Sequence, residues 1–344
     1  MRPPGKAGFA LPAVLVVVAM LALVFLAAAG SMRSLSAETL AAKQAVAFEQ
    51  AARSLEARTA WLAATEPMGP SAILVGGPRA QSRSRLDPVI APRRQVAPVF
   101  LDGRPYRSRD ALGAVFVSLQ DAAGQLNLNL MTDEGRTGVI AQLGVAAGER
   151  GRLAERWADW IDIDDLERLG GAERSDYAAR GLTQPRNGPM TRVSEVLGVL
   201  GWTAAVPRKA WLGLRDRLTV DPGSADFNVN TASATALRIA LDLTPQQAEA
   251  VVAARKQAPL VSLADLTRVI GPLPFDIESS YTRPNGRISL TVTAPGRKLV
   301  FRSRIVLTPD SPERPLWIEE RAVSTVAEGS RAPADAPDFP DLLR

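Results

Sequence analysis

Acidic side chains are concentrated directly after Trp160. Six of them lie within fifteen residues: Asp162, Asp164, Asp165, Glu167, Glu173 and Asp176. Carboxylate oxygens at this density are the hard ligands that calcium prefers in proteins. Gly170 and Gly171 lie between them and can bend the loop so that the carboxylates converge. The EF-hand spacing is absent, so the pattern predicts a calcium site of another kind.

The same acidic residues allow two other interpretations. They could form a solvated loop whose charge is partly neutralised by Arg168, Arg174 and Arg180. A hydrolase with paired carboxylates is conceivable on these residues, but the sequence shows no sign of a substrate cleft. The chain contains neither Cys nor His, which excludes thiolate and imidazole catalysis and the common zinc sites. Carboxylates, hydroxyls, lysine and arginine remain as the possible catalytic groups.

The most apolar stretch of the chain is residues 9–29, which contain no charged residue. A helix of 21 residues rises about 32 Å, which matches the hydrocarbon core of a bilayer. A cleaved secretory signal would have a shorter apolar region, although the small residues 27–30 resemble its cleavage site. The helical pattern continues to about Leu62. The sequence therefore predicts a transmembrane helix at 9–30 that continues into the body of the protein.

The first residues of the chain resemble a type IV prepilin signal, in which a short basic leader ends in a glycine. Here the leader 1–8 ends in Gly8 and is followed by Phe9 and the charge-free helix. The resemblance implies that a prepilin peptidase cuts between Gly8 and Phe9 and methylates the new N-terminus. The alternative is an uncleaved anchor.

Position 13 departs from the pilin pattern. Most pilins carry a glutamate at the fifth mature residue, where this chain has Ala13. A carboxylate in lipid is costly unless it is paired, so the alanine could simply avoid that cost. The other interpretation is that this subunit lies at one end of a filament.

Strand-like and helical patterns alternate in a nested order after the membrane helix. Strand patterns occur at 114–120, 287–293, 298–308 and 316–323, with a Pro295-Gly296 turn between the second and third. Between them, residues 126–281 have a helical pattern. We expect an α+β protein with a pilin-like fold, in which a long N-terminal helix packs on a small antiparallel sheet that carries a large inserted all-α domain. The predicted parts are 31–124 and 286–328 for the pilin-like domain, 125–285 for the inserted domain, and 329–344 for a disordered tail.

Several motifs in the helical part resemble the protein K family of the general secretion pathway, the large minor pseudopilins of type II secretion. The matching segments are 121–130, 160–165, 170–173, 176–177, 187–189, 193–197, 229–232 and 248–255. Together with the leader, they extend the resemblance over nearly the whole chain.

The resemblance implies a subunit that is not an enzyme and that caps and nucleates the tip of a pseudopilus for export of folded proteins across the outer membrane. It implies a single-pass protein of the bacterial inner membrane, with its bulk in the periplasm. The implied partners are other minor pseudopilins, the major pseudopilin, the inner-membrane secretion platform and the prepilin peptidase. It also implies structural calcium, with Asp162, Asp164, Asp165 and Glu173 as the leading ligands.

Residues 228–271 resemble a helix-hairpin-helix unit, a motif that often binds DNA through the backbone N–H groups of a glycine-rich turn. The corresponding turn here is 241–245, which has no glycine and contains Asp242. The net charge of +5 becomes +3 without Arg2 and Lys6, a mild value that gives no indication of nucleic-acid binding. We expect a structural hairpin; the alternative function is a type IV minor pilin-like adhesin or DNA-uptake component.

Overall fold

The chain divides into two compact units, Met1–Ser54 and Leu55–Arg344. The computed structural model describes residues 10–76, 97–110, 113–221, 226–272, 282–311, 313–326 and 333–341. The predicted cleavage site at Gly8 and Phe9 lies outside the described residues.

The first unit consists of the N-terminal part of helix α1 (Ala10–Thr65). Its large apolar side chains between Val14 and Leu26 are all more than half exposed. Among the described residues, α1 is the one helix that is long and apolar enough to cross a membrane. Exposure of this much apolar surface is unfavourable in water, so the helix is consistent with the predicted single-pass anchor.

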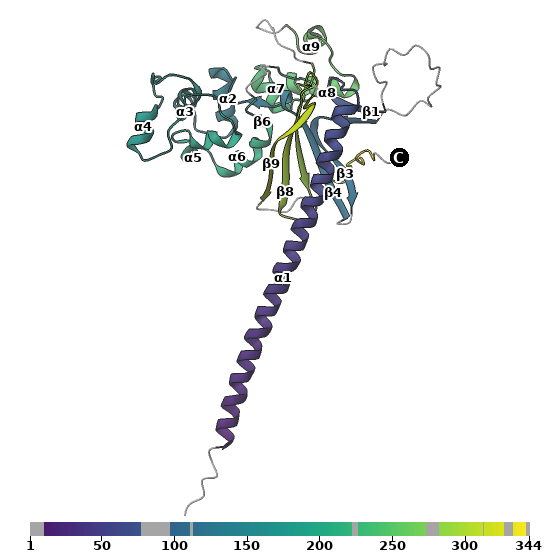
Figure 1. Ribbon diagram of the computed structural model, residues 1–344. Coiled ribbons are helices and arrows are strands. Elements are labelled where there is room, and N and C mark those ends of the chain that lie inside the picture. The colour runs from purple at the N-terminus through teal and green to yellow at the C-terminus, as the bar shows by residue number, and fades with distance from the viewer. Residues whose placement is uncertain are drawn as a thin grey trace, which may run out of the picture. The chain divides into compact units, whose positions relative to one another are not determined.

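The second unit contains a five-stranded antiparallel sheet with the order β3-β4-β7-β8-β9. The strands are β3 (Asp102–Asp110), β4 (Gly113–Asp121), β7 (Arg287–Thr293), β8 (Leu299–Leu307) and β9 (Leu316–Thr325). A separate antiparallel pair is formed by β1 (Ala72–Val75) and β2 (Ala97–Phe100). Figure 1 shows the strands of the larger sheet side by side. The four strands predicted from the sequence correspond to β4, β7, β8 and β9.

The helical part of the chain is inserted between two strands that pair directly. β4 and β7 are hydrogen-bonded from Phe116↔Thr293 to Asp121↔Ile288, although the whole helical module separates them in sequence. In β7, Ile288, Leu290 and Val292 are buried and alternate with partly exposed residues, which is the pattern of a strand with one face on a core. The predicted fold class, pilin-like with an inserted helical domain, is confirmed.

The last turns of α1 belong to the second unit and connect to the sheet. Leu55, Thr59 and Leu62 are buried there. The buried carboxylate of Glu56 forms an ion pair with the guanidinium of Arg321 on β9, with 2.5 Å between Oε2 and Nη2. This contact fixes the end of the helix to the opposite edge of the sheet from β3.

The inserted module is mostly helical, with one short pair of parallel strands, β5 (Leu126–Asn127) and β6 (Leu218–Thr219). Its α-helices are α2 (Asp133–Gln142), α3 (Ala147–Ile161), α4 (Arg174–Ala179), α5 (Trp202–Ala205), α6 (Arg208–Leu214), α7 (Ala234–Ala240), α8 (Pro245–Gln257) and α9 (Leu263–Ile270). Short 3-10 turns are η1 (Ala122–Gly124), η2 (Val193–Gly198) and η3 (Arg215–Arg217). Figure 1 shows α2 to α6 as a group beside the sheet.

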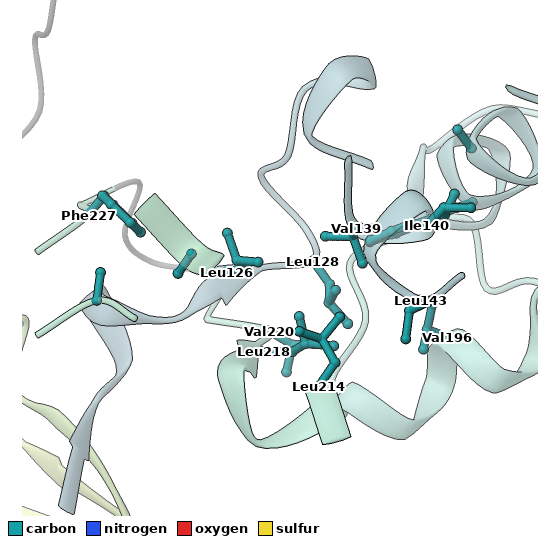
Figure 2. Close-up of a cluster of buried hydrophobic side chains, with 14 of the residues drawn as sticks. Leu126, Leu128, Val139, Ile140, Leu143, Val196, Leu214, Leu218, Val220 and Phe227 are labelled. Carbon is teal, nitrogen blue, oxygen red and sulfur yellow. The ribbon is translucent and has the colours of Figure 1, made fainter. Parts of the chain in front are cut away.

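The module has its own hydrophobic core, which runs from Leu126 to Ile270. Figure 2 shows Leu128, Val139 and Leu214 gathered in one part of it. Elsewhere in the core the ring of Trp202 packs edge-to-face on those of Trp157 and Trp211, at centroid distances of 5.7 and 6.2 Å. Aromatic pairs in this geometry stabilise a core beyond their buried area. They contribute to the stability of a module that has no cysteine and therefore no disulfide.

A buried carboxylate joins the module to the sheet. Asp121, at the end of β4, accepts hydrogen bonds from the side chains of Asn228 and Thr231 at 2.9 and 2.8 Å and from the backbone N–H groups of Ala123 and Asn285 at 3.2 and 3.3 Å. Asn228 also donates to the carbonyl of Pro70 at 2.9 Å. These bonds tie the entry and the exit of the module to the segment that follows α1.

The C-terminal residues differ from the prediction of a disordered tail. Residues 333–341 are described, and Ala336 and Phe339 are buried. Asp338 forms a parallel bridge with Arg107 of β3. The tail prediction is therefore wrong for this segment, because contacts with residues far away in sequence order it.

Candidate metal centre

Three carboxylates meet where α3 ends and α4 begins. Asp159 lies in the last turn of α3, Asp162 caps its C-terminus and Glu173 caps the N-terminus of α4. One oxygen atom from each of them lies within 4.8 Å of the other two. The loop between the two helices returns the chain so that these helix ends face each other.

The loop is fastened to Asp159, whose side chain is fully buried. Its Oδ2 accepts hydrogen bonds from the backbone N–H of Ala172 at 2.9 Å and of Arg168 at 3.3 Å. A Cβ atom on Gly171 would lie 1.9 Å from this oxygen, so a side chain at that position is excluded. Gly170 has a φ of +84°, which favours glycine. Both glycines thus allow the predicted bend.

An aromatic pair connects the last turn of α3 to α4. The rings of Trp160 and Tyr177 pack edge-to-face at 5.3 Å. The hydroxyl of Tyr177 accepts a hydrogen bond from the N–H of Leu200 at 2.8 Å. Both side chains are buried, so the positions of Asp159 and Glu173 depend on a packed core instead of an exposed loop.

Several oxygens of the cluster lack hydrogen bonds. Oδ1 of Asp159, Oδ1 of Asp162 and both carboxylate oxygens of Glu173 are buried and have no hydrogen-bond partner within the described part of the chain. Nε of Arg168 lies 3.5 Å from Oδ1 of Asp159. Buried carboxylates without partners are costly, and a bound cation would remove that cost.

Burial and mutual repulsion change the acidity of these groups. Burial, together with the charges of Asp159 and Asp164, raises the pKa of Asp162 to about 6. Burial and the charges of Asp159 and Asp162 raise the pKa of Glu173 to about 7. Burial also raises the pKa of Asp159. A divalent cation would favour the ionised forms, and an all-oxygen donor set suits a hard cation such as calcium.

The other predicted ligands lie around this cluster. Asp164 accepts a hydrogen bond from the N–H of Leu166 at 2.9 Å, and Asp165 accepts one from the amide of Asn187 at 2.7 Å. Glu167 is exposed. Asp176 accepts a hydrogen bond from the backbone N–H of Glu173 at 3.2 Å. Of the six predicted residues the structure brings together Asp162 and Glu173, and leaves the rest at the rim or outside.

Asp159 was not predicted from the sequence. A signal for it exists, because residues three apart share one face of a helix, and Asp159 precedes Asp162 by three positions. It also lies between Trp157 and Trp160, on the apolar side of α3. An acid on the buried face of an amphipathic helix is a candidate ligand even when no other acid is adjacent.

The hairpin between α7 and α8 shows no DNA-binding turn among the described residues. Asp242 has a φ of +48°, the backbone region that glycine usually occupies. The hydroxyl of Thr244 accepts a hydrogen bond from the N–H of Gln247 at 3.2 Å and begins α8. The turn thus combines a left-handed residue with an added negative charge, which disfavours contact with a phosphate.

The helical module is similar to known proteins. Two family models described as type II secretion system protein K match residues 124–211 and 227–272. The type II secretion system protein K of Pseudomonas aeruginosa is 29% identical over 175 residues, which are 48% of this chain and 51% of that protein. The match thus spans about half the length of that relative.

A solved structure shares the fold. It is the crystal structure of the GspK-GspI-GspJ complex from the type 2 secretion system of enterotoxigenic Escherichia coli. The matched chain superposes with a TM-score of 0.53 at 18% identity, over 85% of this chain and 99% of that one. Both regions of the helical module are thus similar, in the same order, to the type II secretion system protein K family.

Proposed function

We propose that this chain is the minor pseudopilin that nucleates and caps the tip of a type II secretion pseudopilus, for export of folded proteins across the outer membrane. The observation that carries the proposal is the insertion of a large helical module between the paired strands β4 and β7. The module is attached next to the C-terminal end of α1, where Asn228 donates to the carbonyl of Pro70.

The position of the module bears on filament assembly. A subunit within the shaft must accept neighbours at both of its ends, whereas a subunit at the tip needs only one. A bulky module at the C-terminal end of the helix hinders addition of a further subunit there. The chain therefore suits the last position.

The membrane helix supports the same position. Residues 9–29 contain no acid, and Ala13 replaces the glutamate that most pilins carry. In pilins that glutamate is thought to pair with the N-terminal ammonium group of a neighbouring subunit. A subunit that does not offer this acid can still present its own N-terminus after cleavage between Gly8 and Phe9 and methylation of Phe9.

We place the protein in the bacterial inner membrane before assembly, with its bulk in the periplasm, and at the pseudopilus tip afterwards. The similar solved structure is a complex of GspK with GspI and GspJ, which supports other minor pseudopilins as the direct partners. The major pseudopilin, the inner-membrane platform and the prepilin peptidase follow from the proposed function. It includes no enzymatic activity and no binding of nucleic acid.

The candidate metal centre fits a structural calcium ion in this function. Asp159, Asp162 and Glu173 would hold it, with Asp164 and Asp165 close enough in sequence to contribute from the rim. Calcium would bind buried oxygens that have no hydrogen-bond partner among the described residues and would fix the turn between α3 and α4. The alternative function is an adhesin or a DNA-uptake component; DNA uptake has less support because Asp242 occupies the turn where a phosphate would bind.

The test uses the pairing of β4 with β7. Because Asp121 and Ile288 are direct partners, a short turn can replace residues 122–286 and join the two strands as a hairpin. The full chain, co-expressed with the other minor pseudopilins of its system, should form a stable complex and support filaments and secretion. The chain without the module should still enter the membrane but no longer terminate filaments. A full chain that forms no complex with any minor pseudopilin would refute the tip assignment.

A further inference from the structure

The outer edge of β3 is occupied by the chain's own C-terminal segment. We call residues 336–340 the C-terminal strap. The N–H of Arg107 donates to the carbonyl of Pro337, and the N–H of Phe339 donates to the carbonyl of Arg107, both at 2.7 Å. This is the hydrogen-bond pattern of a parallel strand, and the strap adds one step of ladder to β3.

Two arginines bind three more carbonyls of the strap. The guanidinium of Arg107 donates to the carbonyl of Ala336 at 3.1 Å. The guanidinium of Arg58, in the last turns of α1, donates to the carbonyls of Phe339, at 3.3 Å, and of Pro340. Four of the five strap carbonyls thus have a donor. Hydrogen bonds from charged groups are stronger than neutral ones, so the strap is held by more than its single bridge.

The side chain of Phe339 supplies the apolar part of the contact. It is 4% exposed. Its ring lies 6.0 Å from that of Tyr106, in an edge-to-face arrangement, and 5.1 Å from the guanidinium carbon of Arg58. Tyr106 in turn accepts a hydrogen bond from the N–H of Phe100 at 2.6 Å. Phe339 therefore fills a pocket formed by Arg58 at the end of α1 and Tyr106 on β3.

The strap also changes what the sheet edge presents. A bare edge strand is a template for pairing with a strand of another chain. In the strap, Pro337 and Pro340 have no N–H to donate, and Asp338 is an exposed acid. Proline and charge are the features that prevent further strand addition. The strap thus occupies the edge of β3 at Arg107 and places two prolines and an exposed acid there.

We propose that the β3 edge, together with Arg58 and Tyr106, is a binding site for an extended peptide with a buried aromatic residue next to proline, and that the C-terminal strap fills this site in cis. Backbone groups of Arg107 provide the ladder bonds, Arg58 binds the carbonyls after the aromatic residue, and the pocket selects the ring. While the strap is bound, strands of neighbouring subunits have no access to β3.

The experiment removes the strap from the chain and adds it back as a separate peptide. A chain ending at Ala332 is purified in detergent and titrated with a labelled peptide of residues 333–344, followed by fluorescence anisotropy. We expect saturable binding of one peptide per chain. A peptide with Phe339→Ala, or a truncated chain with Arg58→Ala, should bind at least tenfold more weakly. A peptide with Asp335→Ala is the matched control, because Asp335 is exposed, and should bind like the original.

The intact chain should bind none of these peptides in the same concentration range, because its site is filled. A folded truncated chain that fails to bind the peptide would overturn the proposal, as would equal binding of the Phe339→Ala peptide. If the truncated chain does not fold, a protease site inserted within residues 327–332 of the full chain allows the strap to be cut after folding. Retention of the cut strap and its exchange with labelled peptide support the site; loss of the strap without uptake of the peptide refutes it.

Discussion

No side chain can be accommodated at Gly171 while Asp159 keeps its position, because a Cβ atom there would stand 1.9 Å from Oδ2 of Asp159. The same oxygen accepts the N–H of Ala172 at 2.9 Å. The close approach of this glycine to a buried carboxylate is what lets the loop return from α3 to α4.

Gly171→Ala should therefore destabilise the module and weaken any cation site at its centre. We expect a loss of roughly 1–3 kcal/mol, as for other substitutions that overfill a packed site, measured by urea unfolding. Gly151→Ala is the matched control, since nothing lies within 4 Å of a Cβ there and it is inside α3. Alanine in a helix should be neutral or stabilise by up to about 1 kcal/mol. Equal effects of the two substitutions would contradict the packing argument.

Calcium should raise the melting temperature of the full chain, because a ligand that binds only the folded state stabilises it, by about 2.7 kcal/mol at one hundred times its Kd. Asp162→Asn and Glu173→Gln should each reduce this shift strongly, since both carry buried oxygens without hydrogen-bond partners among the described residues. Glu167→Gln, at an exposed position, should leave it unchanged. A melting curve that responds to neither chelator nor calcium would refute the site. The effect of Asp164→Ala shows whether the rim contributes.

The Arg321→Ala variant should show how much the ion pair with Glu56 contributes to the free energy of unfolding. Glu56 is 4% exposed and pairs with Arg321 at 2.5 Å, so Arg321→Ala leaves a buried charge without its partner. We expect a loss of about 3 kcal/mol or somewhat less, because Arg321 is itself partly exposed. Arg53→Ala is the control, since Arg53 and Glu49 form an exposed pair of the kind that contributes about 0.5 kcal/mol or less. Denaturant midpoints of the two variants give the comparison, and similar values would contradict the difference.

The strands could be predicted where alternation and turn residues coincide. The expected strand at 287–293 has the same bounds as β7, because its apolar residues alternate and the Pro295-Gly296 turn follows shortly after it. The insertion was predicted for the same reason, since helical patterns interrupt two groups of strands. The strap could not be predicted, because Arg58 and Arg107, which hold it, lie more than two hundred residues away.

Two residues of the carboxylate cluster were among the predicted ligands. Asp162 and Glu173 lie both in the predicted acidic stretch and in the cluster. Asp164, Asp165 and Glu167 lie in the stretch but not in the cluster. Density of acids says little about which carboxylates are buried, and burial decides which of them need a cation. Asp159 was not predicted because it lies between Trp157 and Trp160 in the sequence, outside the acidic stretch.

The junction carboxylate Asp121 makes stability depend on pH. Burial raises its pKa to about 6 from 3.8, even though four donors favour the ionised form. Since the folded pKa lies above the unfolded one, its contribution to stability is fully present below about pH 4 and is lost as the pH rises through about 6. The shift corresponds to roughly 2–3 kcal/mol. The free energy of unfolding of the wild type should thus fall over this window relative to Asp121→Asn.

The comparison isolates Asp121 because both proteins retain every other titrating group, including Asp162 and Glu173. Asp310→Asn, at an exposed position, is the control and should follow the wild type over the whole range. Unfolding is measured in denaturant from pH 4 to 7.5, with the same calcium concentration in every sample. A constant difference between wild type and Asp121→Asn across that range would show that Asp121 does not titrate there. A difference that changes between pH 4 and 6 would show that the carboxylate joining β4, the module and β7 is protonated in part of that range, and that the joint is weakened as it ionises.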